Sequence, residues 1–321
     1  MKKRMEIIMK NQRLKGNLLL LLTAFVWGLS FISQSKGVET ISPLSFNGIR
    51  CLLGGVVLLP VIAILDKSKK KKCEEVQKLN KTLIVGGIVC GCFLCFASTL
   101  QTIGMVHTSP GKAGFITALY MVIVPIINIF CNKKPSPIIL LSVLIAIGGL
   151  YLMCITSDIS INQGDVLIFL CAFLFAGHIL AIDYFSPKVD GVKLACLQFF
   201  VSGIIDVALM FILEKPKLMP ILNCWAAIGY SGIMSCGVAY TLQIVGQKYT
   251  DPTSASILMS LESVFATLAT VILVALGWEL TGGTLTLREI TGCVLMFVAI
   301  ILVQLPTPQK TSFITRKQQN H

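Results

Sequence analysis

Four ionisable residues stand out inside the long apolar runs of this 321-residue sequence, namely Arg50, His178, Asp206 and Glu262. If these runs cross a membrane, such side chains are costly there and usually mark a substrate path or a proton relay. Glu262 could exchange a proton or bind substrate, and His178 could accept a proton or contact substrate. Arg50 could attract a carboxylate as a rigid fork donor.

Each of these side chains also has a structural interpretation. Glu262 could be protonated and hydrogen-bonded for packing alone, and His178 could form an interhelical hydrogen bond. Arg50 could extend its charge to the membrane surface or pair with Asp206.

Several neutral residues could line the same route. Trp27 lies in the middle of its apolar run, away from the interface where Trp usually gathers. Gln101, Gln243 and Tyr240 are hydrogen-bonding groups that serve equally well as contacts between helices. Pro125 lies inside another apolar run, where it frees a carbonyl of the preceding turn and is a reasonable hinge.

The composition indicates which elements must position these residues. Hydrophobic residues make up 55% of the chain and charged residues 13%, whereas soluble domains carry about 25% charged residues. The mean hydropathy is +0.83. A soluble fold cannot bury this much apolar surface, so the sequence predicts an all-α integral membrane protein in contact with the lipid bilayer.

A bilayer core requires about 20 apolar residues in a helix. Ten apolar runs meet this requirement, and each is therefore predicted to be a transmembrane helix. They cover residues 17–34, 45–65, 82–105, 110–131, 137–155, 164–184, 193–213, 222–246, 253–277 and 288–305.

The basic residues predict the orientation of these ten spans. Twenty-one Lys and Arg fall in the two termini and the even-numbered connections, five fall in the odd-numbered connections, and Arg50 lies within a span. Because cytoplasmic loops carry the excess of Lys and Arg, both termini are expected in the cytoplasm of a multi-pass protein of the cell membrane. This distribution also explains the net charge of +12, so no nucleic-acid partner is expected.

An internal repeat relates the two halves of the chain. Between residues 99 and 119, eight residues recur at a constant offset of 142, among them Gln101 as Gln243. Residues 24–28 align with 172–176 at an offset of 148. Five spans form each half, and five is odd, so the second half must enter the membrane from the opposite side. Such 5+5 inverted repeats are typical of secondary transporters.

The repeat also brings two polar residues into equivalent positions. Glu262 in the ninth predicted span corresponds to Tyr120 in the fourth. The two would face one another across a pseudo-two-fold axis and form a polar site near the bilayer midplane.

The order of short motifs resembles the EamA-type branch of the drug/metabolite transporter superfamily over about residues 17–305. The matching residues are Trp27-Gly28-x-Ser30-Phe31, Arg50, Gln101…Thr108-x-Pro110…Ala113, Gln243…Thr250-x-Pro252…Ala255, Leu119…Pro125, Gly148-Gly149 and Leu261-Glu262. The family often has Glu-Pro in the ninth span. Here Ser263 follows Glu262, so the motif supplies no proline kink there.

The resemblance implies a domain organisation in four parts. Residues 1–16 would form a basic cytoplasmic N-terminus, and residues 306–321 a cytoplasmic tail. Between them, residues 17–160 and 161–305 would form the two five-helix repeats. A homodimer is compatible with this organisation.

These observations predict a secondary carrier of a small-molecule substrate that works by alternating access. An amino acid or related compound is the expected substrate, and export the expected direction. The alternatives are uptake of a carboxylate, sugar or nucleotide-linked solute and, in a different class, a non-transporting membrane scaffold or sensor. The sequence contains no phosphate-binding loop, metal-ligand motif or catalytic pair, so neither enzymatic activity nor a cofactor or metal is expected.

Overall fold

The computed structural model describes residues 2–108, 110–130, 136–154, 161–277 and 286–305. All of its regular structure in these ranges is helical, which confirms the predicted fold class. The tail 306–321, Lys133 and Lys134, and the connection 155–160 lie outside these ranges.

Every predicted span coincides with one helix or with consecutive helices. The first three spans are α1 (Lys2–Thr40), α2 (Pro43–Lys71) and α3 (Lys81–Met105). The fourth is α4 (Pro110–Ala118) with α5 (Tyr120–Phe130), and the fifth is α6 (Pro137–Cys154). The second half consists of α7 (Gln163–Phe185), α8 (Gly191–Leu213), α9 (Leu218–Asn223), α10 (Trp225–Gly229), η1 (Tyr230–Tyr240), α11 (Thr241–Gln247), α12 (Pro252–Met259), α13 (Glu262–Ala275) and α14 (Leu287–Gln304).

The lengths of these helices suit a bilayer. Eight described spans are long and apolar enough to cross a membrane. α6 and α14 have 18 residues each, which rise about 27 Å and lie at the short end of the membrane-spanning range. α1 is much longer than its predicted span, because the basic segment from Lys2 continues the same helix.

Side-chain caps fix the start of several helices. Asn162 and Asp165 form a reciprocal capping box at the start of α7, and Thr286 and Glu289 form another at the start of α14. Such contacts satisfy backbone N–H groups that have no partner within the helix.

Two spans are interrupted at equivalent positions of the repeat. Leu119 separates α4 from α5, and Ser260–Leu261 separate α12 from α13. Here the N–H of Leu119 bonds to the carbonyl of Ile116, and that of Leu261 to Leu258. These bonds span three residues and tighten the turn, a deviation that often marks a functional hinge. The interruption before Glu262 therefore forms without the proline of the family motif.

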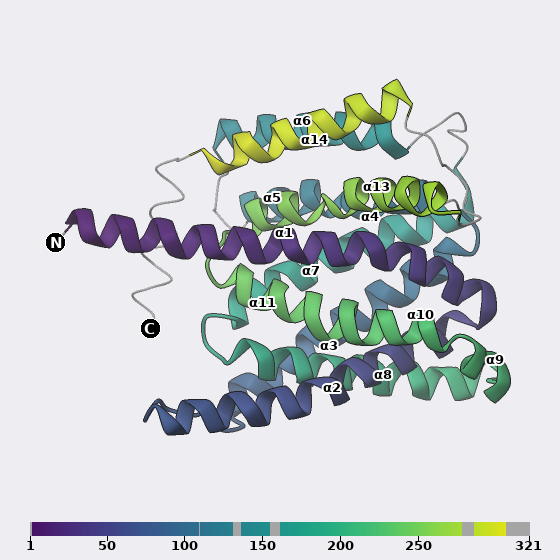
Figure 1. Cartoon of the computed structure of the whole chain (residues 1–321), viewed down its shortest axis with the longest axis horizontal. Coiled ribbons are helices and arrows are strands. Elements are labelled where there is room, and N and C mark those ends of the chain that lie inside the picture. The colour runs from purple at the N-terminus through teal and green to yellow at the C-terminus, as the bar shows by residue number, and fades with distance from the viewer. Residues whose placement is uncertain (1, 109, 131–135, 155–160, 278–285, 306–321) are drawn as a thin grey trace.

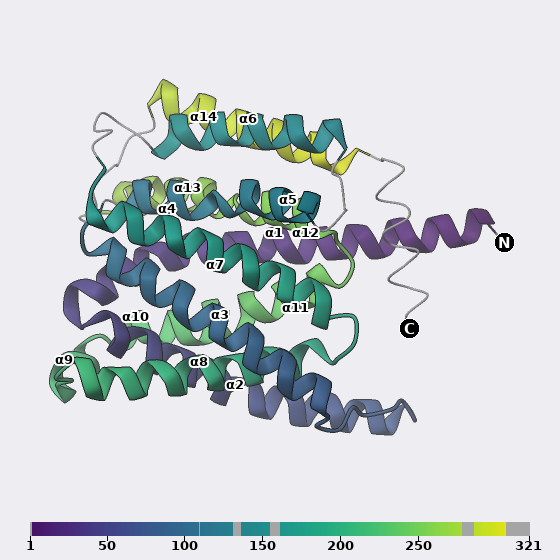
Figure 2. The same cartoon turned by 180° about the vertical axis from the view of Figure 1, so that it is seen from behind.

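The two halves exchange their first helices. α1 packs on η1, α11, α12 and α13 of the second half, and α7 packs on α3, α4 and α5 of the first. α2 packs on α8, and α6 on α14. Figures 1 and 2 show α6 and α14 crossing along one edge of the molecule, with α2 and α8 along the opposite edge. This arrangement is the one expected of a 5+5 inverted repeat.

Glycine pairs at the helix crossings follow the repeat. A Cβ atom added to Gly104 in α3 would lie 2.9 Å from the carbonyl oxygen of Gly164 in α7. At the equivalent crossing of α11 and α1, a Cβ atom on Gly246 would lie 3.0 Å from the carbonyl oxygen of Gly16. Both crossings thus require residues without a side chain, because the two backbones touch.

Hydrogen bonds between the halves follow the same symmetry. Thr108 donates its hydroxyl proton to Asp165 at 2.7 Å, and its repeat equivalent Thr250 donates to Asn17 at 3.1 Å. Asn17 and Asp165 are themselves related by the offset of 148. The same geometry has therefore been kept at both ends of the molecule with different side chains.

α2 and α8 are tied together at both of their ends. Glu214, at the end of α8, accepts hydrogen bonds from the backbone N–H groups of Leu44 and Ser45 at 2.9 and 3.0 Å. At the opposite end, Lys193 of α8 pairs with Asp66 of α2 at 2.8 Å. Glu214 is the repeat equivalent of Asp66, and Lys193 that of Ser45, so the two ties are counterparts.

A second ion pair joins Lys69 and Asp190 at 2.5 Å at the same end as the Asp66–Lys193 pair. Burial alone would raise the pKa of Asp190, but hydrogen bonds from Lys69 and from backbone N–H groups hold the pKa below its ordinary value. Asp190 therefore keeps its charge, and with it the pair, at neutral pH.

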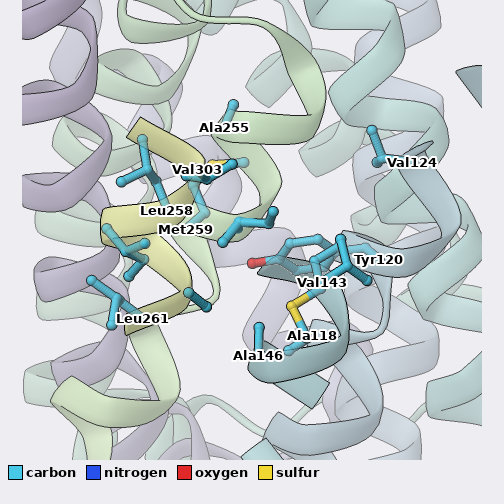
Figure 3. Packing of buried hydrophobic residues seen from close by; sticks show 14 of the residues in the cluster. Ala118, Tyr120, Val124, Val143, Ala146, Ala255, Leu258, Met259, Leu261 and Val303 are labelled. Atoms are coloured by element: carbon cyan, nitrogen blue, oxygen red, sulfur yellow. The ribbon is translucent and has the colours of Figure 1, made fainter. Parts of the chain in front are cut away.

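A large apolar cluster surrounds the interrupted spans. It contains Met121 and Val124 of α5, Leu258 and Met259 of α12, and Val303 of α14, together with neighbours from other helices. Figure 3 shows these side chains meeting between the two halves, with the Tyr120 hydroxyl pointing from its own helix toward α12. The cluster positions the polar groups described next.

Candidate functional site

A central cavity is lined by residues of both halves. All eight residues that the sequence singled out for substrate binding or coupling line this cavity: Trp27, Arg50, Gln101, Tyr120, His178, Tyr240, Gln243 and Glu262. The structure thus brings together side chains from α1, α2, α3, α5, α7, η1, α11 and α13.

Glu262 and Tyr120 meet inside the cavity. The Tyr120 hydroxyl donates a hydrogen bond to Oε1 of Glu262 at 3.3 Å. Each of the two residues is the first of a half-helix, because α5 begins at Tyr120 and α13 begins at Glu262. Glu262 therefore lies at the start of α13, the end of a helix that favours a negative charge.

Arg50 is buried with no acidic partner. Its side chain is 3% exposed, and within the described chain it forms no hydrogen bond or ion pair. The guanidinium carbon lies 5.3 Å from the centre of the Phe46 ring. The alternative in which Arg50 pairs with Asp206 is not what the structure shows. An arginine in this setting presents a fork of donors to the cavity.

Tyr240 is the centre of a group of rings, of which Trp27, His178 and Tyr240 line the cavity and form one wall. The Trp27 ring centre lies 4.6 Å from that of Tyr240, the Phe199 ring 5.7 Å away, and the His178 ring 6.0 Å away. Tyr240 ends the π-helix η1, and such wide turns recur at functional sites. This wall can pack against the apolar body of a small ligand.

The two ring nitrogens of His178 differ in their hydrogen bonding. Its Nε2 atom lies 3.0 Å from Oε1 of Gln198, and the residue is fully buried. Its Nδ1 atom has no hydrogen-bond partner among the described side chains. A neutral histidine that donates from Nε2 to Gln198 offers Nδ1 as an acceptor.

Several buried polar atoms of the lining residues lack a partner from the described protein. They are Nε1 of Trp27, Oε1 of Gln34, Nε of Arg50, Nδ1 of His178 and Oε1 of Gln243. Leaving a buried polar group unpaired costs about 1–3 kcal/mol. A set of such atoms around one cavity is therefore suited to a polar ligand that supplies the missing partners.

The cavity lies on the symmetry axis of the repeat. Seven further residues line the cavity, namely Phe31, Gln34, Thr117, Phe175, Ile179, Ser235 and Met259. Phe175 is the repeat equivalent of Trp27, so applying the repeat offset to that candidate would have found it. Ile179 and Met259 are the equivalents of two other lining residues, Phe31 and Thr117. Gln34 is seven positions after Trp27, on the same helix face.

Two residues from the sequence analysis lie outside this lining. Pro125 lies within α5, which continues through it to Phe130, and the chain is interrupted earlier, at Leu119. Asp206 is fully buried in α8 behind the cavity. It accepts hydrogen bonds from Thr99 and Cys95 of α3 and from Ser202 of α8.

The comparison with protein families agrees with this architecture. The model of the EamA-like transporter family matches twice, at residues 14–155 and 162–305. The chain belongs to the EamA-like transporter family. As an EamA-like transporter it is a multi-pass membrane protein and not an enzyme, and the two matches correspond to the two five-helix halves.

Several curated relatives of this EamA-like transporter are themselves described as transporters. An uncharacterized transporter of Archaeoglobus fulgidus is 29% identical over 302 residues, which cover 92% of this chain and 87% of the relative. The uncharacterized inner membrane transporter YedA of Escherichia coli K12 is 22% identical, covering 87% of each chain. A solved crystal structure shares the fold, with a TM-score of 0.69 at 16% identity, covering 90% of this chain and 96% of that one.

Proposed function

We propose that this transporter carries an amino acid or a related small compound with a carboxylate across the cytoplasmic membrane, by alternating access and in the direction of export. The observation that supports this proposal is Arg50, a buried arginine without an acidic partner that lines the central cavity. A guanidinium binds a carboxylate with two parallel hydrogen bonds. A carboxylate ligand would therefore supply the counter-charge that the protein does not.

The other lining groups suit the rest of such a ligand. The carboxyl group of Glu262 could bind an ammonium group of the ligand, while the aromatic wall around Tyr240 packs against an apolar side chain. The unpaired atoms of Gln34, His178 and Gln243 offer further acceptors.

The inverted repeat supports the mechanism. The two halves share one helix pattern, and their interrupted spans begin anew at Tyr120 and Glu262. Discontinuous helices near the midplane form the substrate sites of many secondary carriers. Exchange of the two local packings between the halves would open the cavity to one side of the membrane and then to the other.

The proposal is tested by counterflow in proteoliposomes that contain the purified full-length protein. We expect flux of at least one L-amino acid from a panel of twenty, together with a rise in melting temperature when that amino acid is added. Loading the substrate on one side and then the other distinguishes export from uptake. Flux of sugars or nucleotide-linked solutes, with none of any carboxylate, would contradict the proposal.

We also propose that both termini lie in the cytoplasm. The support is the division of Lys and Arg between the connections and the position of the first residues of α1 at the same end of the bundle as the lysine-rich end of α2 (Figure 1). Topology reporters fused after residue 321 and within residues 156–163 should report opposite sides of the membrane. The same side at both positions would refute the ten-span arrangement.

A further inference from the structure

A second acidic site lies behind the cavity, at the junction of α2, α3 and α8. Asp206 of α8 is fully buried. Thr99 donates to its Oδ1 atom at 2.7 Å and the Cys95 thiol donates to the same atom at 3.3 Å, while Ser202 donates to Oδ2 at 3.5 Å. All these partners are neutral, so the described structure supplies Asp206 with hydrogen bonds but with no cation within ion-pair distance.

Arg50 is the cation nearest to this site in the packing. α2 touches α8 beside Asp206, because a Cβ atom on Gly48 would lie 3.4 Å from the carbonyl carbon of Asp206. One turn along α2, the Cys51 sulfur lies 3.7 Å from the hydroxyl oxygen of Ser202. Arg50, between Gly48 and Cys51, acts electrostatically on Asp206. In the described part of the chain, thiols also lie around Asp206: Cys95 on α3, Cys51 on α2 and, beyond Cys51, Cys236 on η1.

Arg50 and Asp206 therefore lie on adjoining helices, but the two side chains do not form an ion pair in this structure. An ionised carboxylate without a cation is very costly in a membrane interior, so Asp206 holds a proton in this arrangement. Arg50 is then free to present its guanidinium to the cavity. The repeat does not duplicate this pair of residues in the other half of the chain, because the equivalent of Arg50 is Gln198 and that of Asp206 is Leu58.

We propose that Asp206 is a proton site that competes with the carboxylate of the substrate for Arg50, so that one proton is bound with each carboxylate. This inference rests on the proposed function. In a second conformation of the unloaded carrier, different from the one described above, the Arg50 guanidinium turns back and pairs with ionised Asp206. When a carboxylate takes the guanidinium, Asp206 loses its counter-charge and takes one proton from water. The net charge of the site is the same before and after, since one carboxylate and one proton enter together.

Glu262 cannot take this role in the same way. It lines the cavity, where an ammonium group of the ligand can reach it, whereas Asp206 is not among the lining residues. The ligand can therefore balance the charge of Glu262 but not that of Asp206.

Proton binding is measured by calorimetry of the full-length protein in nanodiscs, with L-leucine, L-phenylalanine and L-glutamate as probes. Each titration is repeated from pH 5 to pH 8 in two buffers of different ionisation enthalpy, and the difference in heat gives the number of protons. We expect the wild type to take up close to one proton per bound amino acid at its maximum. Asp206→Asn should bind with almost none, and Asp206→Glu should restore proton uptake. Glu39→Gln, at an exposed carboxylate, is the matched control and should behave as the wild type.

Each outcome of the titration decides a different point. Binding without proton uptake in the wild type, or uptake that persists in Asp206→Asn, would overturn this inference and leave the proposed function standing. Absence of binding with all three amino acids, and with the other seventeen of the panel, would overturn both. If Asp206→Asn does not fold, infrared difference spectra of the wild type replace it. Added amino acid should then increase the C=O absorption of a protonated carboxyl group, and no increase would overturn the inference.

Discussion

Arg50→Gln is expected to weaken amino-acid binding by about 30-fold or more. Removing one partner of a buried, hydrogen-bonded charge pair costs about 2–5 kcal/mol, and each 1.4 kcal/mol is about tenfold in affinity. Arg50 is buried at the cavity and has no partner of its own in the described protein. The interaction lost in the variant is therefore the one with the ligand, and the affinity for the ligand falls. Calorimetry on the purified protein measures the dissociation constant directly.

Two comparisons give this result its meaning. The wild type should prefer L-leucine to its amide, which lacks the carboxylate, and Arg50→Gln should lose that preference. Arg288→Gln removes an arginine of α14 outside the cavity and should leave binding unchanged. If Arg50→Gln kept the wild-type preference for the acid, the carboxylate would have to be bound elsewhere.

Glu262→Gln is expected to lower counterflow at least tenfold while expression and melting temperature remain close to those of the wild type. Glutamine keeps the shape and most of the hydrogen-bonding capacity of glutamate, so the contact with Tyr120 can persist without the charge. A residue that acts only in packing would show the reverse: lower stability and normal transport by the folded fraction. Counterflow at matched protein density, measured from pH 6 to pH 8, distinguishes the two.

The pairing with Tyr120 adds a geometric test. Tyr120→Phe removes the hydroxyl that donates to Glu262, and residues that share one site give non-additive losses when both are changed. Strictly additive losses in the double variant would show that the 3.3 Å contact has no role in transport. Normal flux in Glu262→Gln would exclude Glu262 and leave His178 as the next candidate.

The sequence predicted the position of every span, because the length of an apolar run is set by the thickness of the bilayer. It also predicted that Tyr120 and Glu262 face each other, since an inverted repeat places equivalent residues about one axis. Both predictions depend on the apolar runs and the internal repeat, which can be read directly from one sequence. The same reasoning explains why eight residues from distant parts of the chain could be expected to line one cavity.

Other features depend on tertiary packing and were not predicted. The turns at Leu119 and Ser260–Leu261 form without a proline at the break. The segment η1 is a π-helix, although no residue type in it requires one. The separation of Arg50 from Asp206 is likewise decided by the hydroxyl and thiol groups of Thr99, Cys95 and Ser202. No periodicity in the sequence brings these five side chains together.

The two ties between α2 and α8 differ in how they respond to dissolved salt. The pairs Asp66–Lys193 and Lys69–Asp190 join full charges that remain partly open to solvent, and mobile ions screen such attraction. The tie at Glu214 is made to backbone N–H groups and a serine hydroxyl, so one full charge meets only dipoles. Raising the ionic strength therefore loosens mainly one end of the helix pair. The two ends of the α2–α8 pair are related by the repeat, but they therefore differ in their sensitivity to salt.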